Sequence, residues 1–198
     1  MQTALAILAA YLLGSVPFAM ISSRLFGLAD PRSYGSGNPG ATNVLRSGNK
    51  KAALLTLLGD ALKGWVAVHA AQRMGFADEI IGLVALAVFF GHLFPIFLKF
   101  RGGKGVATAI GVLIALDPLL GLAAIGTWLL VAFVFRYSSL AAILAAALAP
   151  VYSLLMHGAS ARILVIAILA MALIGKHWQN LQRLLAGRET KIGARKQA

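Results

Sequence analysis

Residues 118–135 read PLLGLAAIGTWLLVAFVF, eighteen residues without a charged side chain. A helix needs about 20 mostly apolar residues to cross the hydrocarbon core of a bilayer. Similar stretches recur along the whole chain of 198 residues, of which 60% are hydrophobic and only 12% are charged. A soluble domain of this size does not need so much apolar surface. The sequence therefore predicts an all-α integral membrane protein whose helices are themselves the domain.

Seven apolar segments are expected in total. They run over about 3–23, 52–72, 80–98, 106–116, 118–135, 139–156 and 162–175. Gly14 and Pro17 predict a kink in the first segment. The segment 106–116 is short, so whether it crosses the membrane fully stays open. We expect a bundle of about seven transmembrane helices in a single domain, 1–198, which ends in an amphipathic basic tail, 176–198.

Basic residues indicate the orientation of this bundle, because Lys and Arg are retained on the cytoplasmic side of a membrane. With the N-terminus outside and seven spans, fifteen of the 18 Lys and Arg residues fall on the cytoplasmic side, together with the C-terminus. The formal net charge of +12 lies beside apolar segments. We therefore expect membrane lipids and phosphorylated substrates as partners, and no nucleic acid. No basic region precedes the first apolar stretch, so a cleavable signal peptide is not expected.

Several common catalytic motifs are absent from the sequence. There is no cysteine, which excludes a thiolate nucleophile and a Cys-based metal site. Only six residues are acidic, and they do not form the Asp cluster that binds magnesium in phosphoryl transfer to lipid headgroups. Neither a His-x4-Asp pair nor a G-x-S-x-G nucleophile elbow occurs. We therefore expect no metal and no cofactor.

The stretch 36–46, SGNPGATNVLR, interrupts the apolar pattern between the first two segments and is called the first island below. Its short side chains leave backbone N–H groups to face a ligand, and a helix that began at Ala41 would add a positive N-terminus. An ordinary loop rich in turn residues is the alternative. We favour phosphate binding because Thr42, Asn43 and Arg46 add polar and basic groups. The candidate ligands are Ser36, Gly37, Asn38, Thr42, Asn43 and Arg46.

The second island, residues 99–105, reads KFRGGKG and leads directly into the segment 106–116. Two glycines and a lysine at the start of a helix favour a second anion-binding loop. It is not a Walker A loop, because Gly105 stands where that motif has a Ser or Thr for magnesium. A basic loop that only records membrane topology is the alternative. The candidates here are Arg101, Gly102, Gly103 and Lys104.

The third island, residues 176–189, reads KHWQNLQRLLAGRE. If it is helical, His177 and Asn180 share one face, and Arg183 follows at a similar step. The tryptophan and the leucines would form an apolar side. A helix lying on the membrane surface and a catalytic role for His177 are equally good interpretations of this pattern.

Two charged residues, Asp60 and Lys63, lie three positions apart inside the second segment. Charges at that depth are costly, so they are expected to pair with each other or to face a cavity. A structural pair is the preferred interpretation. His92, near Pro95, could reach the second island, but a packed histidine with satisfied hydrogen bonds is the preferred interpretation.

The three islands together resemble the bacterial acyl-phosphate:glycerol-3-phosphate acyltransferase family, PlsY. The resemblance rests on SGNPGATNVLR, on GHLFPIFLKFRGGKGVAT at 91–108, and on HWQNLQRLLAGRE at 177–189, in this order in a chain of 198 residues. It implies transfer of a fatty acyl group from acyl phosphate to the 1-hydroxyl of sn-glycerol 3-phosphate, without acyl-CoA. The products are lysophosphatidic acid and inorganic phosphate, in the first step of phospholipid biosynthesis at the bacterial inner membrane, with the site on the cytoplasmic side.

The resemblance also implies roles for the candidate residues. His177, Asn180 and Lys104 would act at the reacting centre, and Gly102 and Gly103 would cradle glycerol 3-phosphate. Arg183 would contact substrate, whereas Glu189 would hold the tail in place by pairing with a loop arginine. The proton of the acceptor hydroxyl would pass either to His177 or to an oxygen of the donor phosphate. Functional coupling to the enzyme that produces acyl phosphate would follow.

A small transporter or lipid-phosphate carrier is the rival interpretation, because half-length segments and glycine-rich helix ends occur in transporters. A transporter should place its polar binding groups near mid-membrane. Here they cluster at one side, and only Asp60 and Lys63 lie deep. The sequence therefore favours an enzyme.

Overall fold

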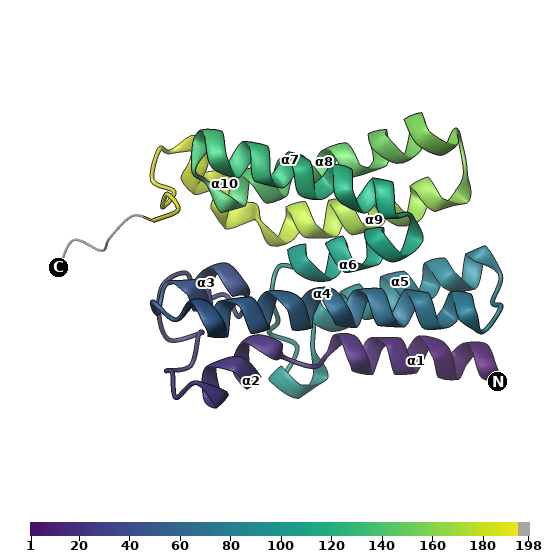
Figure 1. Ribbon diagram of the computed structural model, residues 1–198, viewed down its shortest axis with the longest axis horizontal. Coiled ribbons are helices and arrows are strands. Elements are labelled where there is room, and N and C mark those ends of the chain that lie inside the picture. Colours follow the sequence, from purple (N-terminus) through teal and green to yellow (C-terminus); the bar gives the residue numbers. More distant parts are fainter. Residues whose placement is uncertain (194–198) are drawn as a thin grey trace. The chain divides into compact units, whose positions relative to one another are not determined.

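The computed structural model describes residues 1–193, and the end of the expected tail, 194–198, lies outside this range. The described residues form helices and no strand. The chain divides into two compact units, one from Met1 to Gly121 and one from Leu122 onward. Both are helical, as the apolar pattern predicted (Figure 1).

The first unit holds six α-helices and a short 3-10 helix. They are α1 (Gln2–Gly14), α2 (Phe18–Leu25), α3 (Ala41–Leu45), α4 (Lys50–Arg73), α5 (Asp78–Leu93), η1 (Ile96–Leu98) and α6 (Val106–Leu116). Helix α4 packs against α6, and α1 packs against α5. These crossings are close: a Cβ on Gly111 of α6 would lie 1.9 Å from the Ala61 carbonyl oxygen. Small residues of this kind let membrane helices approach through their backbones.

The second unit is built from α7 (Pro118–Phe135), whose first turn belongs to the first unit, α8 (Ser138–His157), α9 (Ala161–Lys176) and α10 (Trp178–Leu185). Helix α8 packs against α9 through a face rich in buried alanine, which includes Ala142, Ala145 and Ala149. The Thr127 and Tyr152 hydroxyls, 2.7 Å apart, join α7 to α8.

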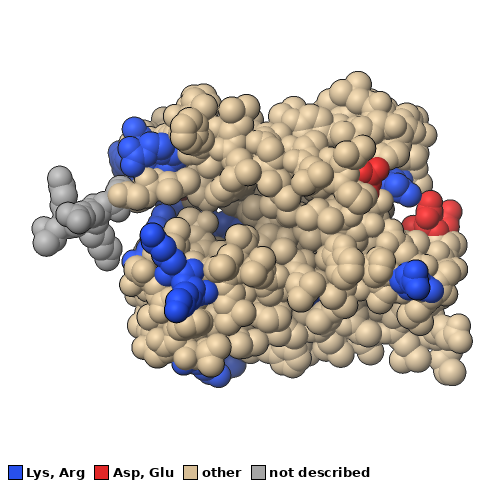
Figure 2. All heavy atoms as spheres, viewed as in Figure 1, with Lys and Arg blue, Asp and Glu red and all other residues tan. Residues whose placement is uncertain are grey.

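Several helices are long and apolar enough to cross a membrane. Four segments are long and apolar enough by themselves: Lys50–Arg73, Asp78–Leu98, Pro118–Phe135 and Ser138–His157. The number of candidate spans rises to six if each bent pair, α1 with α2 and α9 with α10, is counted as one span. Helix α6, the short segment of the sequence pattern, is an apolar helix of 11 residues. Most of the face in Figure 2 is uncharged, and apolar side chains such as Phe133, 85% exposed, lie on the surface, as lipid contact requires.

The expected kink in the first segment is a complete break. Helix α1 ends at Gly14, α2 begins at Phe18, and the two are bent by 40°. The break frees backbone carbonyls that cannot find water inside a membrane. Lys63 Nζ satisfies one of them, since it donates to the Val16 carbonyl oxygen at 2.8 Å. The deep charge on α4 therefore supports a broken helix 47 residues away.

Candidate functional site

The first island folds around the side chain of Asn43, which is buried. Its Oδ1 accepts the backbone N–H of Ser36 at 2.9 Å and the Ser36 hydroxyl at 3.2 Å. Its Nδ2 donates to the carbonyls of Pro31 at 2.6 Å and Tyr34 at 3.1 Å. An amide has two N–H donors and one carbonyl acceptor, so this side chain is committed to the loop. The arrangement favours Asn43 as a brace over the direct phosphate ligand expected from the sequence.

The other candidates of the first island lie on its surface. Helix α3 begins at Ala41, as expected, with Gly40 as its extended N-cap, but it has only 5 residues. Ser36, Gly37, Thr42 and Arg46 are exposed, and Asn38 is partly exposed. These groups can face an anion in the surrounding medium, with the braced backbone beneath them.

Arg32, which lies four residues before the first island, adds little positive charge to it. Its Nε and a terminal nitrogen donate to both carboxylate oxygens of Asp30, with a shortest distance of 2.7 Å. This hydrogen-bonded pair lowers the pKa of Asp30 and raises that of Arg32. The charge of Arg32 is thereby offset locally, which leaves Arg46 as the exposed basic side chain of the island itself.

The second island lies between η1 and α6. Its first two residues, Lys99 and Phe100, have left-handed backbone angles, φ 51° and 62°. Gly105 is the N-cap of α6 with φ 87°, which a glycine adopts without strain. Arg101 is exposed, while Gly102 and Lys104 are partly buried. Since α6 begins directly after Gly105, its positive N-terminus adjoins the basic loop.

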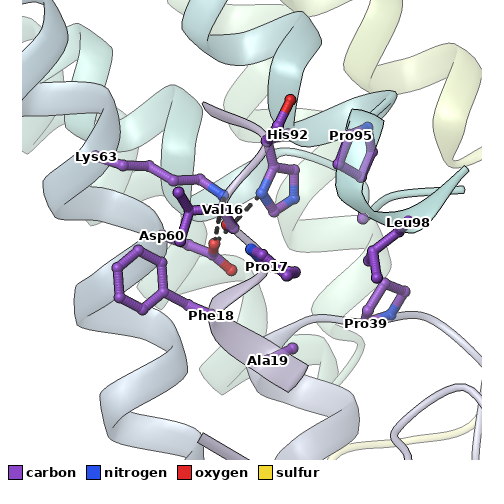
Figure 3. Close-up of a pocket in the computed structure, with 12 residues that line it drawn as sticks. Val16, Pro17, Phe18, Ala19, Pro39, Asp60, Lys63, His92, Pro95 and Leu98 are labelled. Atoms are coloured by element: carbon purple, nitrogen blue, oxygen red, sulfur yellow. Dashed lines mark hydrogen bonds and ion pairs between the residues drawn. The ribbon is translucent and has the colours of Figure 1, made fainter. Parts of the chain in front are cut away.

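The first two islands meet within the first unit. A small cavity is lined by Pro39 of the first island, Gly103 of the second, and Asp60, Lys63 and His92 of the helices (Figure 3). Its volume is about 10 Å³, room for about one water molecule. The cavity is far too small for a substrate. It marks the place where the two loops and the buried charges share one packing centre.

The buried charges form the pair that the sequence predicted. Asp60 Oδ1 lies 2.8 Å from Lys63 Nζ, and both side chains are almost inaccessible to solvent. Sequence reasoning missed the third member, His92, whose Nδ1 lies 3.4 Å from the same carboxylate oxygen. Figure 3 shows the ring of His92 pointing toward Asp60 and Lys63. The available signal was a histidine at the polar end of an apolar segment, in a chain with one deep carboxylate.

The third island lies in the second unit, where its helix α10 bends from α9 by 60°. His177 is buried between the two helices. Its Nδ1 lies 2.8 Å from the Leu173 carbonyl oxygen, and a carbonyl can only accept. Nδ1 therefore carries the hydrogen, and in a neutral ring the lone pair lies on Nε2. The histidine is held in one orientation.

Glu189 organises the rest of the third island. Its Oε1 accepts from the Ser139 hydroxyl at 2.7 Å and from Asn180 Nδ2 at 2.6 Å, and its Oε2 accepts from Arg183 Nε at 2.7 Å. The expected holding role of Glu189 thus fits these contacts, but its arginine lies in α10 and not in a loop. Arg183 was expected to contact substrate, but its Nε donates a hydrogen bond to Glu189. Asn180 is oriented by the same carboxylate.

These contacts set the charge state of Glu189. Burial raises the pKa of Glu189, but hydrogen bonds from Ser139, Asn180 and Arg183 lower it by more, so the pKa falls below its ordinary value of 4.5. A carboxylate whose pKa is lowered by folding contributes its full stabilisation when the pH is above its ordinary pKa. That contribution is lost as the pH falls through the lower folded-state pKa.

Helix α10 is therefore expected to stay attached through Glu189 at neutral pH and to loosen only below about pH 4.5. Hydrogen exchange of residues 178–185 in lipid nanodiscs, corrected for the intrinsic effect of pH, measures this attachment. Protection should be constant from neutral to mildly acidic pH and fall only below that value. Glu189→Gln is the control, since its lower protection should not titrate. Loss of wild-type protection near pH 6 would contradict the assignment.

Metal-binding groups do not occur in the part of the chain that the structure describes: no set of three or more His, Asp or Glu side chains converges there. The structure brings the first and second islands together in one unit and builds the third in the other. Each is a braced polar loop or turn with basic side chains beside it. Such a set suits binding of anionic groups through backbone N–H and cationic side chains.

Comparisons with known proteins identify the family of this chain. The family model described as glycerol-3-phosphate acyltransferase matches residues 4–187. A relative from Dechloromonas aromatica (strain RCB), named glycerol-3-phosphate acyltransferase, is 77% identical over 198 residues, all of both chains. One of the same name from Cupriavidus taiwanensis is 60% identical over 193 residues and covers 96% of each chain.

Two solved structures have the same fold. Both are crystal structures of PlsY, described as an integral membrane glycerol 3-phosphate acyltransferase, one in the glycerol 3-phosphate form and one in the lysophosphatidic acid form. The first has a TM-score of 0.92 at 36% identity, and the second 0.90 at 35%. Each match covers 98% of this chain and 96% of the other. The chain is therefore an all-α integral membrane protein that belongs to the PlsY family of glycerol-3-phosphate acyltransferases.

Proposed function

We propose that this enzyme transfers a fatty acyl group from acyl phosphate to the 1-hydroxyl of sn-glycerol 3-phosphate. The hydroxyl oxygen attacks the acyl carbonyl carbon, and the bond from that carbon to the phosphate oxygen breaks. Inorganic phosphate leaves with the electron pair and takes up the hydroxyl proton. The products are 1-acyl-sn-glycerol 3-phosphate, which is lysophosphatidic acid, and phosphate. The PlsY structures in glycerol 3-phosphate and lysophosphatidic acid forms support this acceptor and product.

One observation carries the proposal: two glycine-rich loops with basic residues adjoin each other at Pro39 and Gly103. Two anionic substrates need two such loops. Acyl phosphate is already activated, so positioning and charge stabilisation are sufficient for catalysis. A donor of this class also agrees with the absence of nucleophile and metal motifs from the sequence.

The residues receive the following roles in this proposal. Lys104, with the backbone of Gly102 and Gly103, binds the phosphate of glycerol 3-phosphate, and Arg101 adds charge. Asn180 and His177 orient reacting groups by hydrogen bonds. In the first island, Asn43 braces the loop that binds the donor phosphate, and the ligands there are Ser36, Gly37, Asn38, Thr42 and Arg46.

The proposal extends to the place of the reaction. The whole chain works as one acyltransferase domain with its N-terminus outside, its C-terminus in the cytoplasm and its site at the cytoplasmic face of the bacterial inner membrane. The basic residues of the three islands support this orientation through the retention of positive charge on that side. Acyl phosphate arrives from the enzyme that makes it, which couples the two activities.

A transfer assay tests the proposal. The protein in lipid nanodiscs is given acyl phosphate and labelled glycerol 3-phosphate with a metal chelator present. Lysophosphatidic acid and inorganic phosphate should form in equal amounts, and acyl-CoA should not replace the donor. No lysophosphatidic acid would overturn the proposed reaction. An equal rate with acyl-CoA would overturn the proposed donor and leave the acceptor in place.

A further inference from the structure

Three titratable side chains inside the first unit have no role in the reaction proposed above. Asp60 and Lys63 on α4 form a buried ion pair at 2.8 Å, and His92 on α5 approaches the same carboxylate at 3.4 Å (Figure 3). Burying charges in a membrane segment is costly. Apolar residues would fill the same space without that cost, so packing alone does not explain why these residues are charged. The groups that the cluster contacts indicate its role.

At one end the cluster holds the broken first helix. Lys63 Nζ donates to the Val16 carbonyl at 2.8 Å, and Val16 lies in the break between α1 and α2. Ser15 and Pro17 of the same break line the cavity beside it. The ammonium group therefore joins the break to α4, while Asp60 balances its charge.

At the other end the cluster holds the second island. The Gly103 N–H donates to the His92 carbonyl at 3.2 Å. A Cβ on Gly103 would lie 2.3 Å from His92 Nε2, and a Cβ on Gly102 would lie 2.1 Å from the His92 carbonyl oxygen. Neither glycine has a positive φ, so backbone angles do not explain why they are glycines. Their lack of a side chain lets the loop rest directly on His92.

We propose that Asp60, Lys63 and His92 form a positioning network that sets the place of the Gly102–Gly103–Lys104 loop for glycerol 3-phosphate. His92 is the residue on which the loop rests, and Asp60 fixes its ring through Nδ1. Lys63 ties this pair to the break of the first helix. The inference rests on the proposed binding of glycerol 3-phosphate by the second island, and it makes His92 a positioning residue that does not touch substrate.

The two glycines supply a matched test, because one would collide with the side chain of His92 and the other with its backbone. Gly103→Ala should raise the KM for glycerol 3-phosphate about 100-fold, the effect of a displacement near 1 Å. His92→Ala alone should raise it about tenfold by loosening the loop. In the double variant His92→Ala/Gly103→Ala the collision with the ring is gone and only a contact of 3.2 Å with the Pro39 carbonyl oxygen remains, so its KM should fall most of the way to that of His92→Ala.

Gly102→Ala is the matched control. Its Cβ meets the backbone of His92, which no side-chain change removes, so adding His92→Ala should not rescue it. In all variants the KM for acyl phosphate should change less than about twofold, because the donor binds the other island. Asp60→Asn should raise the same KM, because it releases the His92 ring and also removes the counter-charge of Lys63.

Hydrogen exchange of residues 99–105 separates this inference from the proposed reaction, since it needs no activity. His92→Ala should speed exchange of the Gly103 amide at least tenfold and leave α6 protected. Equal rescue of both glycine variants, or simple addition of the His92 and Gly103 effects, would overturn the inference in an active enzyme. Unchanged exchange of the loop would overturn it whether or not the protein transfers acyl groups.

Discussion

Lys104→Ala is expected to lower kcat/KM for glycerol 3-phosphate by about 10³-fold, roughly 4 kcal/mol of transition-state stabilisation. Lys104 lies immediately before the N-cap of α6, in the loop that rests on His92. Lys104 is partly buried, and a hydrogen bond between an ammonium group and a phosphate is among the strong ones, which makes its loss costly. Initial rates at varied glycerol 3-phosphate, with saturating acyl phosphate, measure the effect.

Lys99→Ala is the control for this prediction, because Lys99 has the same charge, belongs to the same island and is exposed. Its replacement should change kcat/KM less than about threefold, as expected for a screened surface charge. Lys104→Arg should recover only part of the loss, because a planar guanidinium differs in shape from a compact ammonium. Equal effects of Lys99→Ala and Lys104→Ala would show that the island acts only through its overall charge.

The helical segments could be predicted from the sequence because each depends on a local signal. The expected segments 106–116 and 118–135 meet at Asp117-Pro118, where the proline disfavours a helical residue before it. In the structure α6 ends at Leu116 and α7 begins at Pro118. Asp117 also accepts N–H bonds from Leu119 and Leu120, which starts α7. Hydropathy and proline positions are properties of neighbouring residues, so they need no knowledge of the fold.

The contacts of the islands could not be predicted because they join distant residues. The sequence does not indicate that Lys63 reaches the Val16 carbonyl, and the position of His92 at the polar end of its segment only hints that it reaches Asp60. The same limit applies to Asn43: composition marks it as polar, but only the loop geometry shows that both ends of its amide are spent on the loop. The residue type predicts what a side chain can bind. Its place in the fold decides whether other protein groups already occupy its hydrogen-bonding atoms.

Glu189 shows the intermediate case. Its anchoring role was expected, but the sequence pointed to a loop arginine as its partner. The chain turns back after α10 through Gly187, which has φ 67°, and this turn returns Glu189 to Arg183 and Asn180 of α10. A glycine after a helix is a readable stop signal, whereas the direction in which the chain returns depends on packing against Ser139 of α8.

His177→Ala is expected to lower kcat about 100-fold while leaving the acidic limb of the pH–rate profile in place. The buried ring donates from Nδ1 to the Leu173 carbonyl, so the lone pair of the neutral ring lies on Nε2. A carbonyl partner, unlike a carboxylate, adds little stabilisation to an imidazolium, so the ring suits orientation better than proton uptake. The departing phosphate, which carries negative charge on several oxygens, is the better proton acceptor.

The pH profile of kcat separates these two roles of His177. If the ring only orients the hydroxyl, the limb near pH 6 belongs to substrate phosphate and persists in His177→Ala, and His177→Gln recovers part of the rate through its amide. If the ring takes the proton, that limb disappears with the imidazole and glutamine cannot restore it. His157→Ala, at the exposed end of α8, is the control and should match the wild type. Disappearance of the limb would assign proton transfer to His177 and remove it from the phosphate.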